Sequence, residues 1–188
     1  NSSYLSLNGA PLPQALVAFL AKQPQITAAT GVVNVNTEGV TLGAAGINFA
    51  EFNAMSGGFK FLEGGSFRGP NDVIVDDFYA NQKKKKVGDT IRLWNTDWRV
   101  SGIIQSGMLA HIVVPIETLQ ETTGNVGKVS QIYLKTVPGA NVSSVVQSLL
   151  KVPGLEGFPI YSIEEFAALL NIGNVPGLQP FILVIMGI

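Results

Sequence analysis

Two stretches of this chain carry the same pattern. Tyr4-Leu-Ser-Leu-Asn-Gly-Ala-Pro-Leu-Pro-Gln-Ala-Leu-Val-Ala-Phe-Leu-Ala-Lys-Gln-Pro-Gln-Ile26 aligns with Tyr133-Leu-Lys-Thr-Val-Pro-Gly-Ala-Asn-Val-Ser-Ser-Val-Val-Gln-Ser-Leu-Leu-Lys-Val-Pro-Gly-Leu155 at a constant offset of 129 residues. Six aligned positions are identical: Tyr4/Tyr133, Leu5/Leu134, Val17/Val146, Leu20/Leu149, Lys22/Lys151 and Pro24/Pro153. Each copy has a short strand pattern, a turn rich in Pro, Gly and Asn, and a helical pattern. We interpret the two stretches as an internal repeat.

Each copy contains one amphipathic helix, because its apolar residues recur at i, i+3 and i+4 spacing. These residues are Leu16, Phe19 and Leu20 in the first copy, and Val145, Val146, Leu149 and Leu150 in the second. Pro24 and Pro153 then end the helices, since proline disfavours helical geometry in the residue before it. Strand patterns follow at Ile26–Asn36 and Leu155–Tyr161.

Two such βαβ units predict an α+β fold of the ferredoxin-like split βαβ type, with one four-stranded sheet and both helices on one face. A pseudo-two-fold axis would relate the units, so we expect Leu20 and Leu149 to occupy equivalent buried positions. The residues between the two copies are too many for a loop in a compact domain. They predict an inserted small β-rich lobe.

Strand patterns in the insert are separated by Gly, Pro and Asn. Gly57-Gly58 and Gly64-Gly65 predict an irregular connection. We predict strands at Val40–Phe49, Asp72–Asp76, Thr90–Trp94, Trp98–Ile104 and His111–Val114, a hairpin turn at Asn95-Thr96-Asp97, and helices at Asp77–Gln82 and Ile116–Thr122.

The last eleven residues, Leu178-Gln-Pro-Phe-Ile-Leu-Val-Ile-Met-Gly-Ile188, contain no polar side chain after Pro180. A transmembrane helix needs roughly 20 apolar residues, and we interpret this run as the start of one. A buried C-terminal core helix or strand is the alternative. We therefore divide the chain into four parts: residues 1–68, the first half of a membrane-proximal βαβ lobe plus a connection; 69–128, the inserted lobe; 129–177, the second half plus a helix; and 178–188, the start of a membrane helix.

The composition excludes several classes of function. With 12 basic and 13 acidic residues, the chain has no electrostatic feature that favours nucleic acid or an anionic membrane surface. It has no cysteine, which rules out disulfides and thiolate chemistry. The start at Asn1 shows neither the basic nor the apolar part of a secretory signal.

Few residues suggest chemistry. His111 is the only histidine, and without a nucleophile-elbow sequence we interpret it as structural. Asp72, Asp76 and Asp77 lack the spacing of a metal site, so we interpret them as strand-end carboxylates or helix caps. No phosphate-binding glycine loop is present. We therefore predict no catalytic, cofactor-binding or metal-binding residue.

Three further features concern surfaces and joints. The run Lys83–Lys86 indicates a solvated turn, with binding of a lipid headgroup or an acidic partner as the alternative. Trp94 and Trp98 are expected to pack on the faces of the hairpin. Ser162-Ile-Glu-Glu165 has the form of a capping box and predicts a helix over residues 162–171, docked on the domain. The residues that follow, Gly173, Pro176 and Gly177, would interrupt that helix.

The middle of the chain resembles a known family. The runs Phe61-Leu-Glu-Gly-Gly-Ser-Phe67, Asp72-Val-Ile-Val-Asp-Asp-Phe-Tyr-Ala80, Lys86-Val-Gly-Asp-Thr-Ile-Arg-Leu93 and Trp98-Arg-Val-Ser-Gly-Ile-Ile104 are similar, in this order, to the MacB-type periplasmic core domain of FtsX-like ABC transporter permeases. The chain departs from the family pattern at Gly65, where the family often has arginine, and Arg68 lies three residues later. These motifs consist of turn glycines and strand residues, so they specify a fold rather than a site.

The resemblance implies an extracytoplasmic domain at the cell membrane that couples ATP-driven motion of flanking helices to export, extraction or activation of a substrate or partner. It implies a cytoplasmic ABC ATPase that hydrolyses the ATP, a second permease copy, and an extracytoplasmic adaptor, lipoprotein or peptide as partners. The helix that starts at Ser162 would be the lever that transmits the motion. Two alternatives remain: a membrane-anchored binding or sensor module with no transport role, and an enzyme that uses His111.

Overall fold

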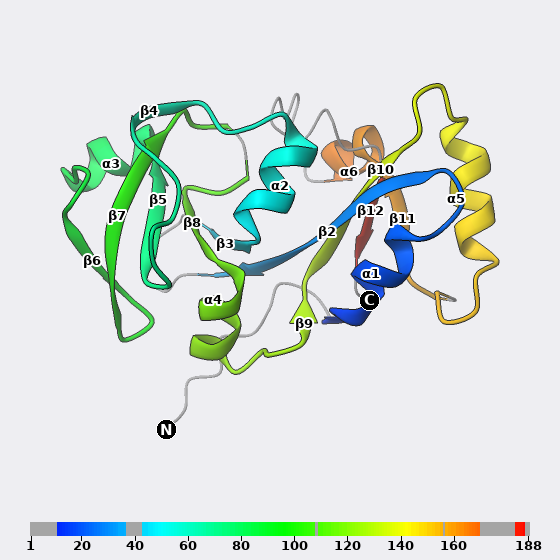
Figure 1. Ribbon diagram of the computed structural model, residues 1–188, viewed down its shortest axis with the longest axis horizontal. Coiled ribbons are helices and arrows are strands. Elements are labelled where there is room, and N and C mark those ends of the chain that lie inside the picture. The colour runs from blue at the N-terminus through cyan, green and yellow to red at the C-terminus, as the bar shows by residue number, and fades with distance from the viewer. Residues whose placement is uncertain (1–10, 37–42, 108, 156, 170–182, 187–188) are drawn as a thin grey trace.

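The computed structural model describes residues 11–36, 43–107, 109–155, 157–169 and 183–186 (Figure 1). Its helices are α1 Ala15–Ala21, α2 Phe49–Ser56, α3 Asp77–Lys83, α4 Ile116–Thr123, α5 Val142–Leu150 and α6 Ile163–Leu169. Its strands are β1 Leu12–Pro13, β2 Ile26–Val35, β3 Ala44–Ile47, β4 Phe61–Gly64, β5 Asp72–Asp76, β6 Thr90–Leu93, β7 Thr96–Ile104, β8 Ile112–Pro115, β9 Lys128–Val129, β10 Gln131–Thr136, β11 Ile160–Ser162 and β12 Leu183–Met186. The mixture confirms the predicted α+β class.

One mixed sheet of ten strands organises the molecule, in the order β11-β12-β10-β2-β3-β8-β5-β7-β4, with β6 paired to β7. The long strand β2 joins the strands of the βαβ units to the strands of the insert. It pairs with β10 over Ile26–Val32 and with β3 over Val32–Val35. β1 and β9 form a separate two-stranded sheet. The strands of the insert therefore continue the sheet of the βαβ units.

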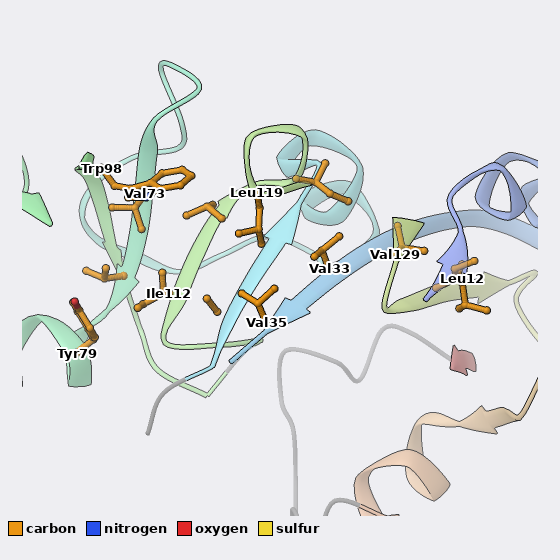
Figure 2. Close-up of a cluster of buried hydrophobic side chains, with 14 of the residues drawn as sticks. Leu12, Val33, Val35, Val73, Tyr79, Trp98, Ile112, Leu119 and Val129 are labelled. Atoms are coloured by element: carbon orange, nitrogen blue, oxygen red, sulfur yellow. The ribbon is translucent and has the colours of Figure 1, made fainter. Parts of the chain in front are cut away.

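Each face of the sheet carries its own core, because neighbouring strand residues point to opposite faces. Val33 and Ile132 belong to the first cluster, with side chains from α1, α3, α4 and α5. Val32 and Tyr133 belong to the second, with Phe52 of α2 and Ile163 of α6. Figure 2 shows the first cluster extending from Trp98 and Val73 to Val129 and Leu12.

The repeat is confirmed where the structure describes it. Leu20 of α1 and Leu149 of α5 are both buried in the same cluster, so both helices cover the same face. The first strand of the first copy lies in residues 1–10, outside the described residues. The sheet is larger than the predicted four strands, because β3 adds the strands of the insert through parallel pairing with β8.

Four local predictions need correction. Phe49 begins α2 instead of ending a strand, and the Asn48 side chain caps this helix by accepting from Glu51 N at 3.1 Å. The connection that follows contains β4. The hairpin turn lies at Trp94-Asn95, where both residues have positive φ, a two-residue turn that suits strand twist. The strand predicted at Leu155–Tyr161 begins only at Ile160, because the N–H groups of Leu155 and Phe158 donate to the carbonyl oxygens three residues earlier, as in turns.

The apolar tail is described in part. Leu183–Met186 form β12, which lies between β10 and β11 in the sheet. That residues 178–188 begin a membrane helix stays a prediction, with the core strand as its alternative. Residues 178–182, 187 and 188 lie outside the described residues. Separate unfolding of an inserted lobe at residues 69–128 stays a prediction, although one sheet and one core cluster connect its strands to the rest.

Candidate functional site

The family-like runs meet where β4 crosses β7. Gly64 has φ +67°, and a Cβ there would lie 2.2 Å from Ser101 O. On the facing strand a Cβ at Gly102 would lie 2.4 Å from Gly65 O and 2.6 Å from the Phe61 ring. These distances are too short for a side chain, so both positions require glycine. A Cβ at Gly65 meets nothing within 4 Å, so a larger residue would fit at this position.

The run Lys86-Val87-Gly88-Asp89 is a turn fastened to β7. Gly88 N donates to Val100 O at 2.8 Å, and Val100 N donates to Asp89 O at 2.8 Å. The Asp89 carboxylate accepts from Lys86 N at 2.9 Å. The shared motifs therefore fix backbone geometry, as the sequence predicted.

Asp72 forms an ion pair with Arg99. Arg99 Nε and Nη2 donate to the two carboxylate oxygens at 3.0 and 2.9 Å, and the backbone N–H groups of Arg68 and Gly69 also donate to this carboxylate. Burial favours the neutral acid, but the hydrogen bonds from Arg99 and Arg68 outweigh burial and lower the pKa of Asp72. The bridge fastens β5 to β7.

Asp76 and His111 also pair, at 2.5 Å between Oδ2 and Nδ1. The other carboxylate oxygen of Asp76 accepts from Tyr79 N at 2.8 Å and caps α3, which confirms the helix-cap interpretation. Beside it, Asp77 accepts from the backbone N–H of Ser106 at 2.9 Å, and hydrogen bonds from Ser106 lower the pKa of Asp77. The carboxylates of all three aspartates bond to neighbouring protein groups.

The run Lys83–Lys86 forms the exposed end of α3 and the turn after it. Lys84 has φ +52° and ends the helix, and Lys85 Nζ donates to Thr90 O at 3.1 Å. These contacts agree with the predicted solvated turn. Beyond it, Trp94 and Trp98 pack edge to face with ring centroids 5.8 Å apart, and Trp98 Nε1 donates to Leu93 O.

The predicted capping box at α6 is present. Glu165 N donates to Ser162 Oγ at 3.1 Å, and Ser162 N donates to Glu165 Oε2 at 2.8 Å. Ile163, in the first turn, is buried in the second core cluster. The helix thus begins at the end of the edge strand β11 and is docked on the domain. The break at Gly173, Pro176 and Gly177 lies outside the described residues.

Within the described ranges, no group of three or more acidic or histidine side chains is arranged to hold a metal ion. The same residues contain no helix long and apolar enough to cross a membrane. Sequence reasoning missed the two pairs, Asp72 with Arg99 and Asp76 with His111. The partners lie 27 and 35 residues apart, and no local pattern joins them.

Fold and motif geometry together define a class of domain: a mixed sheet in which the residues of the motifs are packing glycines and turn residues. The family model described as MacB-like periplasmic core domain matches residues 2–152, and the chain belongs to this family. The resemblance stated from the sequence motifs is thereby confirmed. This family consists of periplasmic or extracellular domains of ABC transporter permeases.

Solved structures share the fold. The periplasmic region of MacB from Actinobacillus actinomycetemcomitans is 17% identical, with a TM-score of 0.59, over 95% of this chain and 79% of that one. The extracellular domain of the ABC-type transporter YknZ from Gram-positive bacteria is 16% identical, with a TM-score of 0.58, over 73% and 79%. A permease domain from Porphyromonas gingivalis is 17% identical, with a TM-score of 0.52, over 79% and 70%. Curated protein sequences give no match.

Proposed function

We propose that this domain couples ATP-driven motion of flanking membrane helices to the export, extraction or activation of an extracytoplasmic substrate or partner. The observation that carries the proposal is the family match over residues 2–152. ATP hydrolysis would take place on a separate cytoplasmic ATPase domain or subunit. A second permease copy and an extracytoplasmic adaptor, lipoprotein or peptide complete the proposed assembly at the cell membrane.

The geometry of α6 supports a mechanical role. Two capping hydrogen bonds and the buried Ile163 fix the start of this helix to the domain. Ile163 packs in the same cluster as Tyr133 of β10, so a force on the helix is applied directly to the sheet. A rigid interior transmits such a displacement, because close-packed side chains have little room to yield. We infer that α6 is the lever between the membrane segment and the domain.

An insertion in the intact protein tests the lever. Several flexible Gly and Ser residues are inserted between Gly173 and Gly177, and ATP hydrolysis and transport are measured in vesicles that contain the protein and its ATPase. We expect hydrolysis to continue while transport is lost. The same insertion beside Gly139, a turn glycine with φ +77° and open space around it, is the control and should preserve both. Full transport with the first insertion would refute the lever.

The ATPase partner is tested separately. We expect an ABC ATPase to copurify with the tagged intact protein from membranes. If the protein purifies without any ATPase, and its gene encodes no ATPase domain, the binding or sensor module becomes the better description.

A further inference from the structure

Two short strands, β4 and β6, lie end to end along one side of β7. β6 pairs with residues 96–99 of β7, and β4 pairs with residues 102–104. Between these stretches, Asp89 O accepts a hydrogen bond from β7 and Gly65 N donates one to it. β5 takes the other side of β7, and no described strand pairs with the outer side of β4 or β6. We call this outer side, which lies at the end of the molecule away from α5 (Figure 1), the β4–β6 edge.

Glycines leave room along this edge. A Cβ at Gly65 or at Gly88 meets nothing within 4 Å. Strand positions without a side chain allow another backbone to approach closely. A sheet edge offers N–H and C=O groups to which an extended segment binds as an additional strand. The β4–β6 edge therefore has both the room and the backbone groups for one more strand.

The lysine run at residues 83–86 lies beside this edge. Lys85 Nζ donates to Thr90 O of β6 at 3.1 Å, and the other three lysines are exposed. None of the four forms an ion pair with a described residue. Residues 83–89 contain these four lysines against the single acid Asp89, a net charge of +3, whereas the whole chain has a net charge of −1. The edge is thus flanked by uncompensated positive charge.

Two exposed apolar side chains adjoin the charged turn. Val87 is 39% exposed, and Leu62 of β4 is 50% exposed. A Cβ at Gly64 would lie 3.0 Å from Val87 Cγ2, so Val87 lies against β4 at a position two residues after Leu62. The turn that carries the lysines and the strand that forms the edge therefore make one surface, which is both apolar and positively charged.

This charge selects the strand that fits. Edge lysines repel an identical edge, which disfavours a second copy of this chain as the occupant. An acidic strand gains backbone hydrogen bonds, apolar contacts with Leu62 and Val87, and attraction to the lysines. A lipid headgroup supplies the charge but no backbone groups for the edge. We propose that the β4–β6 edge binds an extended acidic segment of a partner protein that also carries apolar side chains. The site lies away from α6, and the proposal does not depend on the lever.

Peptide binding to the 188-residue chain tests the proposal. The probe is a short fluorescein-labelled peptide in which glutamate alternates with valine, and fluorescence anisotropy measures its Kd. A second peptide has proline in place of each valine, so it keeps the charge but cannot form a strand in a sheet. We expect the valine peptide to bind about tenfold more tightly than the proline peptide, and to bind more weakly as salt is added.

Matched charge reversals locate the site. Lys83→Glu combined with Lys86→Glu should weaken binding of the valine peptide about tenfold, because two attractions become repulsions. Lys22→Glu combined with Lys151→Glu changes the net charge equally at two exposed positions that follow α1 and α5, and should leave the Kd nearly unchanged. Fluorescence of the buried Trp98 verifies that each variant is folded.

A second pair of variants tests the apolar part of the surface. Leu62→Ser should weaken binding several-fold, whereas Leu150→Ser, at a position 41% exposed on α5, should not. Absence of binding by the valine peptide, equal binding by the proline peptide, or equal weakening by the two lysine pairs would overturn the proposal. If the chain instead sediments with phosphatidylglycerol vesicles, loses this in the Lys83 and Lys86 variant and binds no peptide, the surface binds lipid headgroups and the proposal is wrong.

Discussion

Replacing Leu20 or Leu149 with alanine tests whether the two repeat helices bury equivalent residues. Leu20 is 0% exposed and Leu149 is 2% exposed, and both belong to the cluster that covers one face of the sheet. The loss of about three buried carbon groups at roughly 0.8 kcal/mol each lowers the free energy of unfolding by about 2.4 kcal/mol. The cavity left behind adds to this, so we expect each variant to lose about 2–5 kcal/mol.

The chain offers a control beside each leucine. Phe19 and Leu150 are neighbours of the two core leucines, and they are 42% and 41% exposed. Alanine at these positions removes partly hydrated surface and leaves no closed cavity, so we expect losses well below those at the core positions. Urea denaturation of all four variants measures the free energies at an unchanged m-value. If the core variants lose no more than their controls, or if Leu20 and Leu149 differ severalfold, the structural equivalence of the helices is refuted.

Two further predictions follow from the contacts of β7. Gly102→Ala should destabilise the domain, because its Cβ would lie 2.4 Å from Gly65 O. Gly65→Ala should be close to neutral in the same thermal unfolding assay, since its Cβ meets nothing within 4 Å. Equal melting temperatures for the two variants would contradict the packing argument. The lowered pKa of Asp72 means that its ion pair with Arg99 adds stability above the ordinary carboxyl pKa of 3.8, and that this contribution is lost as the pH falls through the lowered folded value. Asp72→Asn should therefore have a lower free energy of unfolding than the native chain at neutral pH and approach the native value in acid. Urea titrations from about pH 7 to about pH 2 measure both free energies. A constant difference between them over this range would exclude the charge effect.

Local features of this protein could be predicted from the sequence, because neighbouring residues decide them. Helical spacing placed α1 and α5 and their buried leucines, and prolines ended both helices near the expected residues. Both hydrogen bonds of the capping box at Ser162 and Glu165 were predicted between the correct atoms, since they join residues only three positions apart. The same kind of signal, Asn48 followed by Glu51, would have located α2.

The family also followed from the sequence, because its motifs contain glycines and turn residues, and at some of these positions the backbone leaves no room for a side chain. Gly64 and Gly102 show the reason: each would place a Cβ against backbone that cannot move. A candidate site could not be derived in this way. Asp72 with Arg99 and Asp76 with His111 come together only because parallel β5 and β7, and antiparallel β5 and β8, align them across the sheet.

Only the tertiary structure decided how the strands are ordered. A strand pattern states which face is apolar but not which neighbour supplies the hydrogen bonds, since every strand offers the same backbone groups. The sequence predicted an inserted lobe but could not predict that the parallel pairing of β3 with β8 joins its strands to the same sheet. The tail shows the same limit. Leu183–Met186 are apolar enough for a membrane helix or a core strand, and only the structure shows that they pair with β10 and β11.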